Sequence, residues 1–259
     1  METTEHPYYV IISTTEDNKH ELEISRYYQD IDNLYDKTKN GIIRSILGKL
    51  DLKGKTVLDL GCGIGYWTGV FAERGAKVFA LDVNESKIAT ANYYLKKLGI
   101  RDRVHLVSAD AASFDAKDMY DVVFAKDIIE HIADDGLFLR NVKAHLKDDG
   151  VAIIVTQNSY SLNFMVEKIL HFLEGKKNWC GWDPTHLRFY TFQSLANKAR
   201  SASMKVCRFQ SSYIIPYRFF EVLSKKVGRH KVFRFFDRHC NKFPFSIAGW
   251  SIICEIRGR

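Results

Sequence analysis

Val57-Leu-Asp-Leu-Gly-Cys-Gly-Ile-Gly-Tyr66 reads as a short buried strand that runs into three glycines and then into a helix. Glycine admits positive φ and lets the backbone approach a ligand closely, because it has no Cβ. A dinucleotide-binding turn would have its third glycine at position 66, where this chain has a tyrosine. The spacing here is GxGxG, with Asp59 in the strand before it. We expect loop amides and a cationic ligand to satisfy the buried Asp59 carboxylate, which favours a sulfonium amino acid over a pyrophosphate.

On both sides of this loop, the spacing of the apolar residues alternates between the pattern of a strand and that of a helix. Residues 20–50 have helical spacing with a predicted break at Asn40-Gly41. Predicted strands cover 55–60, 77–82, 103–108, 120–125 and 150–156, and predicted helices cover 66–74, 84–98 and 136–146. After residue 157 we expect helices over 163–173 and 191–201 and strands over 205–213 and 246–256. Strands alternating with helices predict an α/β fold, a doubly wound seven-stranded, mostly parallel sheet covered on both faces.

Two further carboxylates follow predicted strands. Asp82 ends the second strand, where a carboxylate can accept hydrogen bonds from both hydroxyls of a ribose. Asp110 follows the third strand, where its carboxylate can accept from an adenine amino group while the Ala111 amide meets a ring nitrogen. An aspartate at the end of a strand is also a common turn former. The order of the three acidic positions along the chain favours the ligand interpretation.

With these residues the chain resembles the class I S-adenosylmethionine-dependent methyltransferases, through VLDLGCGIG, LDVNE, VSADA and DVVFAKDIIEHI over residues 25–156. The resemblance implies a Rossmann-like fold, a glycine loop on the methionine side of the cofactor, and ribose and adenine contacts at Asp82 and Asp110. It also implies that Lys126 and Asp127 lie beside the methyl donor. The cofactor-binding residues expected are Tyr27, Tyr35, Asp59, Gly61, Gly63, Gly65, Trp67, Asp82, Val83, Asp110, Ala111 and Lys126.

Within this class, Arg26-Tyr-Tyr-Gln-Asp30 and Thr185-His-Leu-Arg-Phe-Tyr-Thr191 look like the small-molecule branch that includes ubiquinone-type O-methyltransferases. We expect residues 1–50 to form an N-terminal helical cap and 51–156 the cofactor-binding core. Residues 157–245 are expected to form a helical lid inserted after the fifth strand, together with the sixth strand. Residues 246–259 would return as the final strand. His186, Arg188 and Tyr190 are expected to face the bound methyl group. In the alternative, His186 and Arg188 tie the insertion to the core through backbone carbonyls.

Methyl transfer from a sulfonium needs mainly the correct placement of the acceptor, so a catalytic base is optional. The candidate catalytic residues are His131, His186 and Tyr190. The two histidines are candidates for a base because an imidazole titrates near neutral pH, although each could equally be structural. Asp127, Glu130 and His131 resemble the Glu-x-x-Glu-His motif of metal-using O-methyltransferases. The first position is Asp rather than Glu, and adjacent Glu-His pairs also occur in class members without metal. We therefore assign no metal ligands, and a divalent ion stays as an alternative.

Charge and cysteine content bear on partners and location. Residues 151–259 contain 18 Lys and Arg against 6 Asp and Glu, whereas residues 1–150 contain 20 against 25. The basic aromatic stretch 217–238 could form a helical cap, lie on an anionic membrane or bind RNA phosphates. Five widely spaced cysteines without a CxxC pair, and the lack of a signal sequence or a long apolar run, predict a cytoplasmic protein, with peripheral membrane contact as an alternative.

Three functions compete on these observations. The first is an enzyme that methylates an O or N atom of a small-molecule or lipid-precursor acceptor. The second is an RNA methyltransferase, which the basic half favours; however, Ala125-Lys-Asp-Ile128 stands where enzymes that methylate base nitrogens have an NPPY or DPPY tetrad. The third is a non-catalytic scaffold that keeps the cofactor loop. The acidic and glycine positions favour cofactor binding, and the sequence does not identify the acceptor.

Overall fold

The computed structural model describes residues 16–32, 34–115, 118–176, 181, 183–214, 216 and 247–258, with only the backbone of Leu34 and Tyr35. The expected contacts of the Tyr35 side chain and of the basic stretch 217–238 therefore lie outside the described residues.

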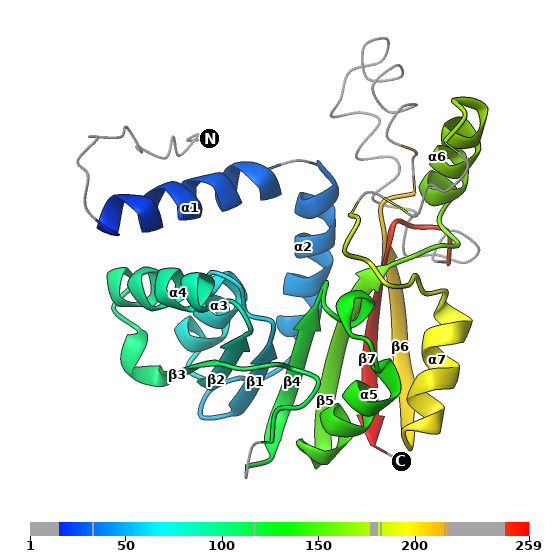
Figure 1. Cartoon of the computed structure of the whole chain (residues 1–259). Coiled ribbons are helices and arrows are strands. Elements are labelled where there is room, and N and C mark those ends of the chain that lie inside the picture. Colours follow the sequence, from blue (N-terminus) through cyan, green and yellow to red (C-terminus); the bar gives the residue numbers. More distant parts are fainter. Residues whose placement is uncertain are drawn as a thin grey trace, which may run out of the picture.

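Seven strands form one sheet in the order β3-β2-β1-β4-β5-β7-β6 (Figure 1). They are β1 (Thr56–Leu60), β2 (Lys77–Asp82), β3 (Val104–Ser108), β4 (Tyr120–Lys126), β5 (Leu146–Gln157), β6 (Met204–Ser212) and β7 (Ser251–Gly258). Neighbouring strands from β3 to β5 pair in parallel, and β7 runs antiparallel to both β5 and β6. The predicted seven-stranded, mostly parallel, doubly wound sheet is confirmed.

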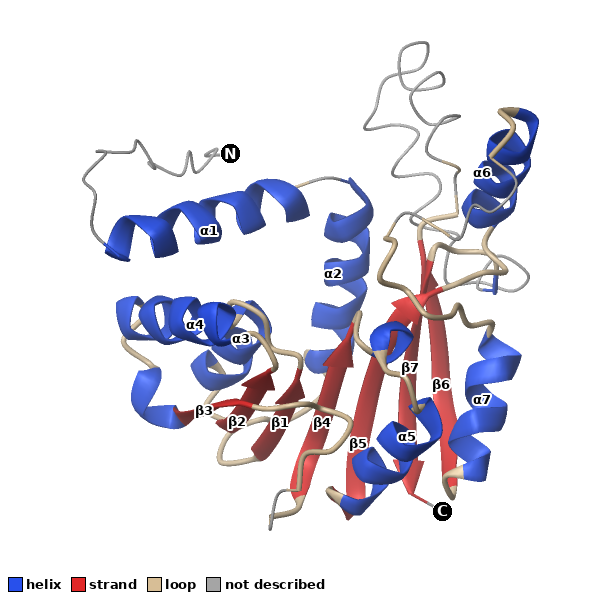
Figure 2. Cartoon of the chain, in the orientation of Figure 1, coloured by secondary structure: helices blue, strands red, loops and turns tan. Residues whose placement is uncertain are grey.

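Helices cover both faces of this sheet (Figure 2). They are α1 (Glu16–Ile31), α2 (Leu34–Leu47), α3 (Tyr66–Glu73), α4 (Glu85–Lys97), α5 (Asp135–Ala144), α6 (Leu162–Leu173) and α7 (Phe192–Ser201). Apolar side chains of α2, α3 and α4 form one core with the sheet, and those of α5 and α7 form another on the opposite face. The α6 helix lies beyond the carboxyl ends of the strands.

The predicted break at Asn40-Gly41 is wrong. Helix α2 runs through both residues, and the chain turns instead between Ile31 and Leu34. A glycine inside a helix costs about 1 kcal/mol relative to alanine, and the apolar face of α2, which includes Ile43 and Leu47, is fully buried. Packing of that face therefore outweighs the local cost of Gly41.

Helix α1 lies across α4 and is joined to it by side-chain hydrogen bonds (Figure 1). The hydroxyls of Tyr28 and Tyr94 lie 2.7 Å apart, and His20 Nδ1 lies 2.7 Å from the Thr90 hydroxyl. The Tyr93 hydroxyl donates to Glu21 at 2.7 Å. These contacts hold the N-terminal helix close to α3, which follows the glycine loop, and so fix its position relative to the candidate site.

Candidate cofactor and acceptor site

The glycine loop takes the backbone conformation that its sequence predicts. Gly61, Gly63 and Gly65 have φ values of +72°, +55° and +83°. A Cβ on Gly61 would collide with Ile128, and one on Gly65 would lie 3.0 Å from the Cβ of Ala91. No atom lies within 4 Å of the position of a Cβ on Gly63. Tight packing therefore requires the outer two glycines, while the middle one leaves open space that a ligand can enter.

Asp82 connects this loop to the end of β2. Its Oδ2 accepts a hydrogen bond from the Gly63 amide at 2.9 Å, and its Oδ1 accepts from the Asn84 amide at 2.9 Å. The next residue, Val83, is 74% exposed. An ionised carboxylate has about four acceptor positions, so Asp82 retains capacity for ligand hydroxyls. The apolar side chain of Val83 therefore stands directly beside the Asp82 carboxylate.

Asp110 follows β3 at the same edge of the sheet and is exposed. Its carboxylate accepts from the Ala112 amide at 2.9 Å, which is the bond of a local turn. Ala111 is buried in the core, and the Ala109 amide donates to the Asp82 carbonyl at 3.1 Å. The segment after β3 is thus adjacent to Asp82.

Asp59 is buried at the base of the loop and has a partner that the sequence analysis missed. The hydroxyl of Thr68, on α3, donates to Asp59 Oδ2 at 2.6 Å, where loop amides were expected. Burial raises the pKa of Asp59 to about 7, even though the bond from Thr68 lowers it. A carboxyl group with this pKa becomes fully ionised most readily when a cation binds nearby.

Beside the loop, two lysines neutralise Asp127. Lys126, at the end of β4, donates to Asp127 Oδ2 at 2.6 Å, and Lys39, on α2, donates to the same oxygen at 2.9 Å. Burial would raise the pKa of Asp127, but the two ammonium groups hold it well below its usual range. Burial lowers the pKa of Lys126. Lys39 was not predicted from the sequence, because a lysine in a helix with an expected break gave no sign of pointing inward.

Next to this cluster, two of the three predicted catalytic residues come together. The rings of His131 and His186 have centroids 4.7 Å apart, and His131 Nδ1 lies 3.0 Å from the Thr185 hydroxyl. Glu130 is fully buried and accepts a hydrogen bond from the Thr156 hydroxyl at 2.8 Å. Burial and the charge of Asp127 raise the pKa of Glu130, while burial and His131 lower that of His186.

Tyr190 and Arg188 bond to partners other than this pair of histidines. The Tyr190 hydroxyl donates to Asp135 Oδ2 at 2.7 Å, and Arg188 donates to the carbonyls of Ile132 and Ala133 at 2.6 and 2.7 Å. The guanidinium Nη1 of Arg188 also lies 3.3 Å from Asp135 Oδ2. For Arg188 this geometry matches the alternative in which its side chain ties the segment to the core through backbone carbonyls.

Two aromatic residues expected near the cofactor differ in placement. Tyr27 of α1 packs against Tyr66, at the start of α3, with ring centroids 5.5 Å apart. Burial raises the pKa of Tyr27, and the charges of Tyr66, Asp127 and Asp59 add to the effect. Trp67 is buried in the core against Phe124, at 5.5 Å between ring centroids. Its indole therefore supports α3 from below the loop.

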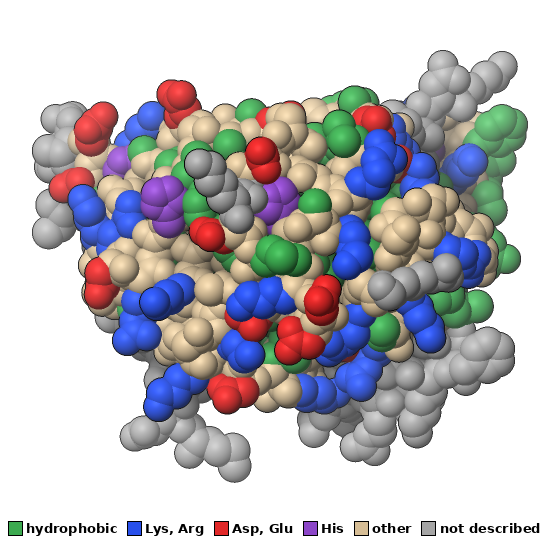
Figure 3. Space-filling model, turned by 90° about the horizontal axis from the view of Figure 1, so that it is seen from below, with side chains coloured by type: hydrophobic (Ala, Val, Ile, Leu, Met, Phe, Trp, Pro, Cys, Tyr) green, Lys and Arg blue, Asp and Glu red, His purple; other side chains and the backbone are tan. Residues whose placement is uncertain are grey.

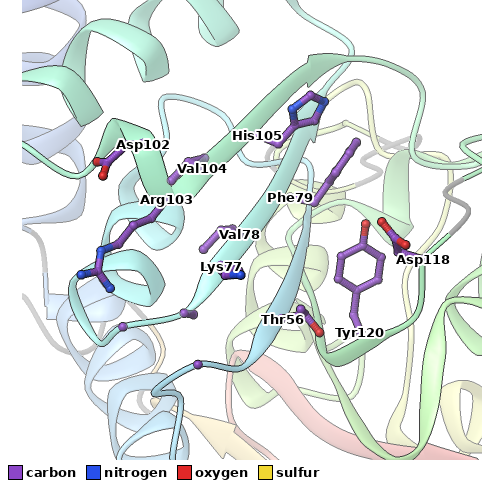
Figure 4. A pocket seen from close by; sticks show the side chains of 13 residues that line it. Thr56, Lys77, Val78, Phe79, Asp102, Arg103, Val104, His105, Asp118 and Tyr120 are labelled. Carbon is purple, nitrogen blue, oxygen red and sulfur yellow. The ribbon is translucent and has the colours of Figure 1, made fainter.

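A hollow of about 660 Å³ lies at the opposite edge of the sheet (Figure 4). The first residues of four strands line it, namely Thr56, Lys77, Val104 and Tyr120. In the view from below Figure 1, basic and acidic side chains are interspersed over the surface (Figure 3). Ligands of doubly wound sheets bind at the carboxyl ends of the strands, so this hollow is not the candidate cofactor site.

Comparison with known proteins agrees with this geometry. The family model of a methyltransferase domain matches residues 35–206. The chain belongs to the methyltransferase domain family. Its predicted resemblance to class I S-adenosylmethionine-dependent methyltransferases is thereby confirmed. A ubiquinone biosynthesis O-methyltransferase of Azorhizobium caulinodans is 32% identical over 134 residues, which are 49% of this chain and 53% of that relative. The match thus spans about half the length of the relative.

Solved structures show that this methyltransferase-family chain shares its fold with proteins of different activity. The magnesium protoporphyrin IX methyltransferase of Synechocystis PCC 6803, solved with bound SAH, has a TM-score of 0.62 at 15% identity and covers 94% of this chain and 97% of its own. The cyclase SpnF has a TM-score of 0.56 at 18% identity, and the match covers 80% of this chain and 76% of SpnF. At these identities the likeness establishes the fold alone.

Proposed function

We propose that this protein transfers a methyl group from S-adenosylmethionine to an O or N atom of a small-molecule or lipid-precursor acceptor. The observation that most supports the proposal is the bond between the Gly63 amide and Asp82, which joins the glycine loop to the end of β2. This bond places the glycine loop, whose backbone a ligand can approach closely, and a carboxylate at the edge where such sheets bind ligands. The relative named for ubiquinone biosynthesis favours an oxygen acceptor on a lipid precursor.

The cofactor would lie along the carboxyl ends of β1, β2 and β3. Its methionine part would contact the glycine loop, its ribose hydroxyls would donate to Asp82, and its adenine would meet Val83 and the segment from Asp110 to Ala111. The cationic sulfonium and ammonium groups would favour ionised Asp59, whose pKa burial raises to about 7.

The acceptor would enter beside His131 and His186. The sulfonium is already an activated leaving group, so the chain's main task is to hold the acceptor atom in line with the methyl carbon. The methyl-to-sulfur bond breaks as the bond from the acceptor to carbon forms, and its electron pair returns to sulfur. When the acceptor is a hydroxyl, the imidazole of His131 or His186 can take its proton. Neutral imidazole is favoured at His186, because burial lowers its pKa.

A divalent ion fits one set of these residues. Glu130, His131 and His186 offer ligand atoms within 4.8 Å of one another, and Glu130 Oε1 and His186 Nδ1 are buried without a hydrogen-bond partner among the described residues. Asp127, which the sequence placed in the alternative ligand set, is instead neutralised by lysines. A bound ion would supply Lewis acidity toward the acceptor oxygen.

We expect turnover to survive dialysis against a chelator, because in-line displacement from a sulfonium needs no metal. The measurement is the rate of label transfer before dialysis, after it, and after adding back Mg²⁺ or Zn²⁺. A rate that disappears on dialysis and returns with the ion would instead give Glu130, His131 and His186 the role of ligands.

The acceptor class can be tested with cell extract and S-adenosylmethionine labelled in its methyl group. The wild-type protein is compared with Asp82→Ala, which should bind the cofactor poorly. We expect label in the small-molecule or lipid fraction with the wild type alone. Label in RNA would favour the second function. Cofactor binding by calorimetry without label in any fraction would favour a scaffold.

A further inference from the structure

Helix α6 turns its apolar side outward. Counted from Leu162, the residues at positions i, i+3, i+7, i+10 and i+11 are all apolar and form one face of the helix. Every one of them is exposed. Ile169, Phe172 and Leu173 are exposed by 60%, 64% and 73%. We call this surface the outer face of α6: Leu162, Met165, Ile169, Phe172 and Leu173.

The buried side of the same helix combines polar residues with Phe164. Asn163 is fully buried and Glu167 nearly so, and His171 lies 3.8 Å from Glu167. An ordinary helix at a protein surface buries its apolar stripe and exposes its polar residues. Here a stripe of five apolar residues is exposed instead, and polar residues share the buried side. The contacts of the inner side fix the orientation of the helix, so the outer face stays exposed.

The outer face stands beside the candidate acceptor site. Helix α6 begins at Leu162, soon after β5 ends at Gln157. On its inner side, the ring of Phe164 lies 4.9 Å from that of Phe189, which lies 5.5 Å from the ring of His186. A surface bound to the outer face would therefore be close to the entrance that the proposed acceptor uses.

The charge around the outer face favours an anionic lipid surface as its occupant. Lys168 is exposed and lies on the same side as Met165 and Phe172, and the exposed Lys176, which pairs with Glu174 at 3.4 Å, follows the helix. Residues 151–259 contain 18 basic against 6 acidic residues. Lysine stems can lie along apolar surface while their ammonium groups reach phosphates. Helix α6 has 12 residues, and no described helix is long and apolar enough to cross a membrane, so α6 would lie in the plane of the interface.

We propose that the outer face of α6 docks on the headgroup region of an anionic bilayer. Docking itself is independent of the proposed function. Its use, to admit a lipid-precursor acceptor directly from the bilayer to His131 and His186, rests on that function.

Flotation of the full chain with vesicles tests this proposal. The vesicles contain phosphatidylcholine alone or with about a third phosphatidylglycerol, an anionic lipid. We expect the wild type to float with the anionic vesicles. Ile169→Glu combined with Phe172→Glu should lower the bound fraction at least about tenfold, because both apolar contacts are lost and two negative charges are added. The matched control is Leu22→Glu with Leu137→Glu, at exposed apolar positions on α1 and α5, which should float as the wild type does.

Two further measurements make the result decisive. All variants should keep the wild-type melting temperature and cofactor affinity, since the changed side chains are exposed. Light scattering gives the mass of each protein without lipid. The proposal is overturned if the wild type stays in solution, if the α6 variant floats like the control, or if a wild-type dimer becomes a monomer in the α6 variant while neither binds vesicles. Loss of methyl transfer with flotation intact would contradict only the proposed function.

Discussion

Asp82 joins the glycine loop to β2 and also offers acceptor positions for a ribose. We predict that Asp82→Ala weakens S-adenosylmethionine binding more than about tenfold, because two charge-assisted hydrogen bonds of roughly 1.5–3 kcal/mol each are lost. Titration calorimetry measures the change. Asp102→Ala, in the hollow at the opposite edge of the sheet, serves as the control and should bind normally. Wild-type affinity in the Asp82 variant would mean that the ribose binds elsewhere.

Asp59 should make the stability of the cofactor-free protein depend on pH. Its pKa is about 7 in the folded protein and about 3.9 in an unfolded chain, so the folded state retains the proton longer. The contribution of Asp59 to stability should therefore be greatest below about pH 4, fall as the pH rises to about 7, and level off above it. Asp59→Asn stays neutral and can still accept the bond from Thr68.

We predict that Asp59→Asn is more stable than the wild type at pH 8, by up to about 4 kcal/mol for a shift of three pKa units. Urea denaturation of both proteins at pH 5 and pH 8 measures the difference, which should be smaller at pH 5. Asp102→Asn, at the opposite edge of the sheet, is the control. Equal stability gaps at the two pH values would show that Asp59 is ionised in the folded protein without cofactor.

At the scale of elements, residues 183–190 join the candidate acceptor site to the core. His186 faces His131, whereas Arg188 bonds to the carbonyls of Ile132 and Ala133. We predict that His186→Ala lowers acceptor turnover without changing cofactor affinity. Arg188→Ala should lower the unfolding free energy by about 0.5–1.5 kcal/mol, since the hydrogen bonds to the two carbonyls are lost. Kinetics per folded molecule and thermal melting separate the two effects.

The two variants serve as controls for each other. If both lower the melting temperature and neither changes turnover, the whole segment is structural, and the acceptor binds elsewhere. If Arg188→Ala changes turnover at unchanged stability, its side chain contacts the acceptor in the working enzyme.

Periodicity predicted the elements from residue 55 to 157 well, because each strand there is a short apolar run bounded by glycine or a polar turn. It failed at α2, where burial of Ile43 and Leu47 keeps Gly41 helical. It predicted α6 as an amphipathic helix but not its orientation. A pattern shows that a helix has an apolar stripe, and only the surrounding chain decides whether that stripe finds a protein partner.

The candidate site was predictable where the chemistry lies within one segment. The glycine loop and Asp82 could be identified because a strand, a turn and a helix follow one another in sequence. Lys39 and Thr68 could not, since each depends on how a helix faces a distant or buried carboxylate. Likewise, the pairing of His186 with His131 joins residues 55 positions apart. Contacts of this kind arise from packing and leave no local pattern.

At the scale of the whole molecule, the fold alone does not decide the chemistry. A cyclase and a methyltransferase share this architecture with the chain. The arrangement that favours methyl transfer is local, in the glycine loop, Asp59 and Asp82. The remainder of the sheet supplies rigidity, and in it β7, the last strand in the sequence, lies between β5 and β6.

We therefore predict that the cofactor site depends on residues far from it in sequence. Truncation before Ser251 removes β7, which pairs with both β5 and β6 and has Ile252 and Ile253 fully buried in the two cores. Without it β5 presents an open edge, and β6 with α7 loses its attachment to the sheet. The truncated chain should show no cooperative unfolding in urea and should not bind S-adenosylmethionine, although every predicted cofactor residue is retained.

Point variants in β7 make the same test in the full-length chain. Ile253→Val removes one buried methyl group and should cost only about 0.5–1.5 kcal/mol, leaving cofactor affinity intact. Ile253→Asp buries a charge without a partner at a position with 1% exposure, and should abolish both folding and binding. If the truncated chain unfolds cooperatively and binds the cofactor as the wild type does, β1 to β5 with their helices form a self-sufficient unit, and β6 and β7 serve the acceptor side alone.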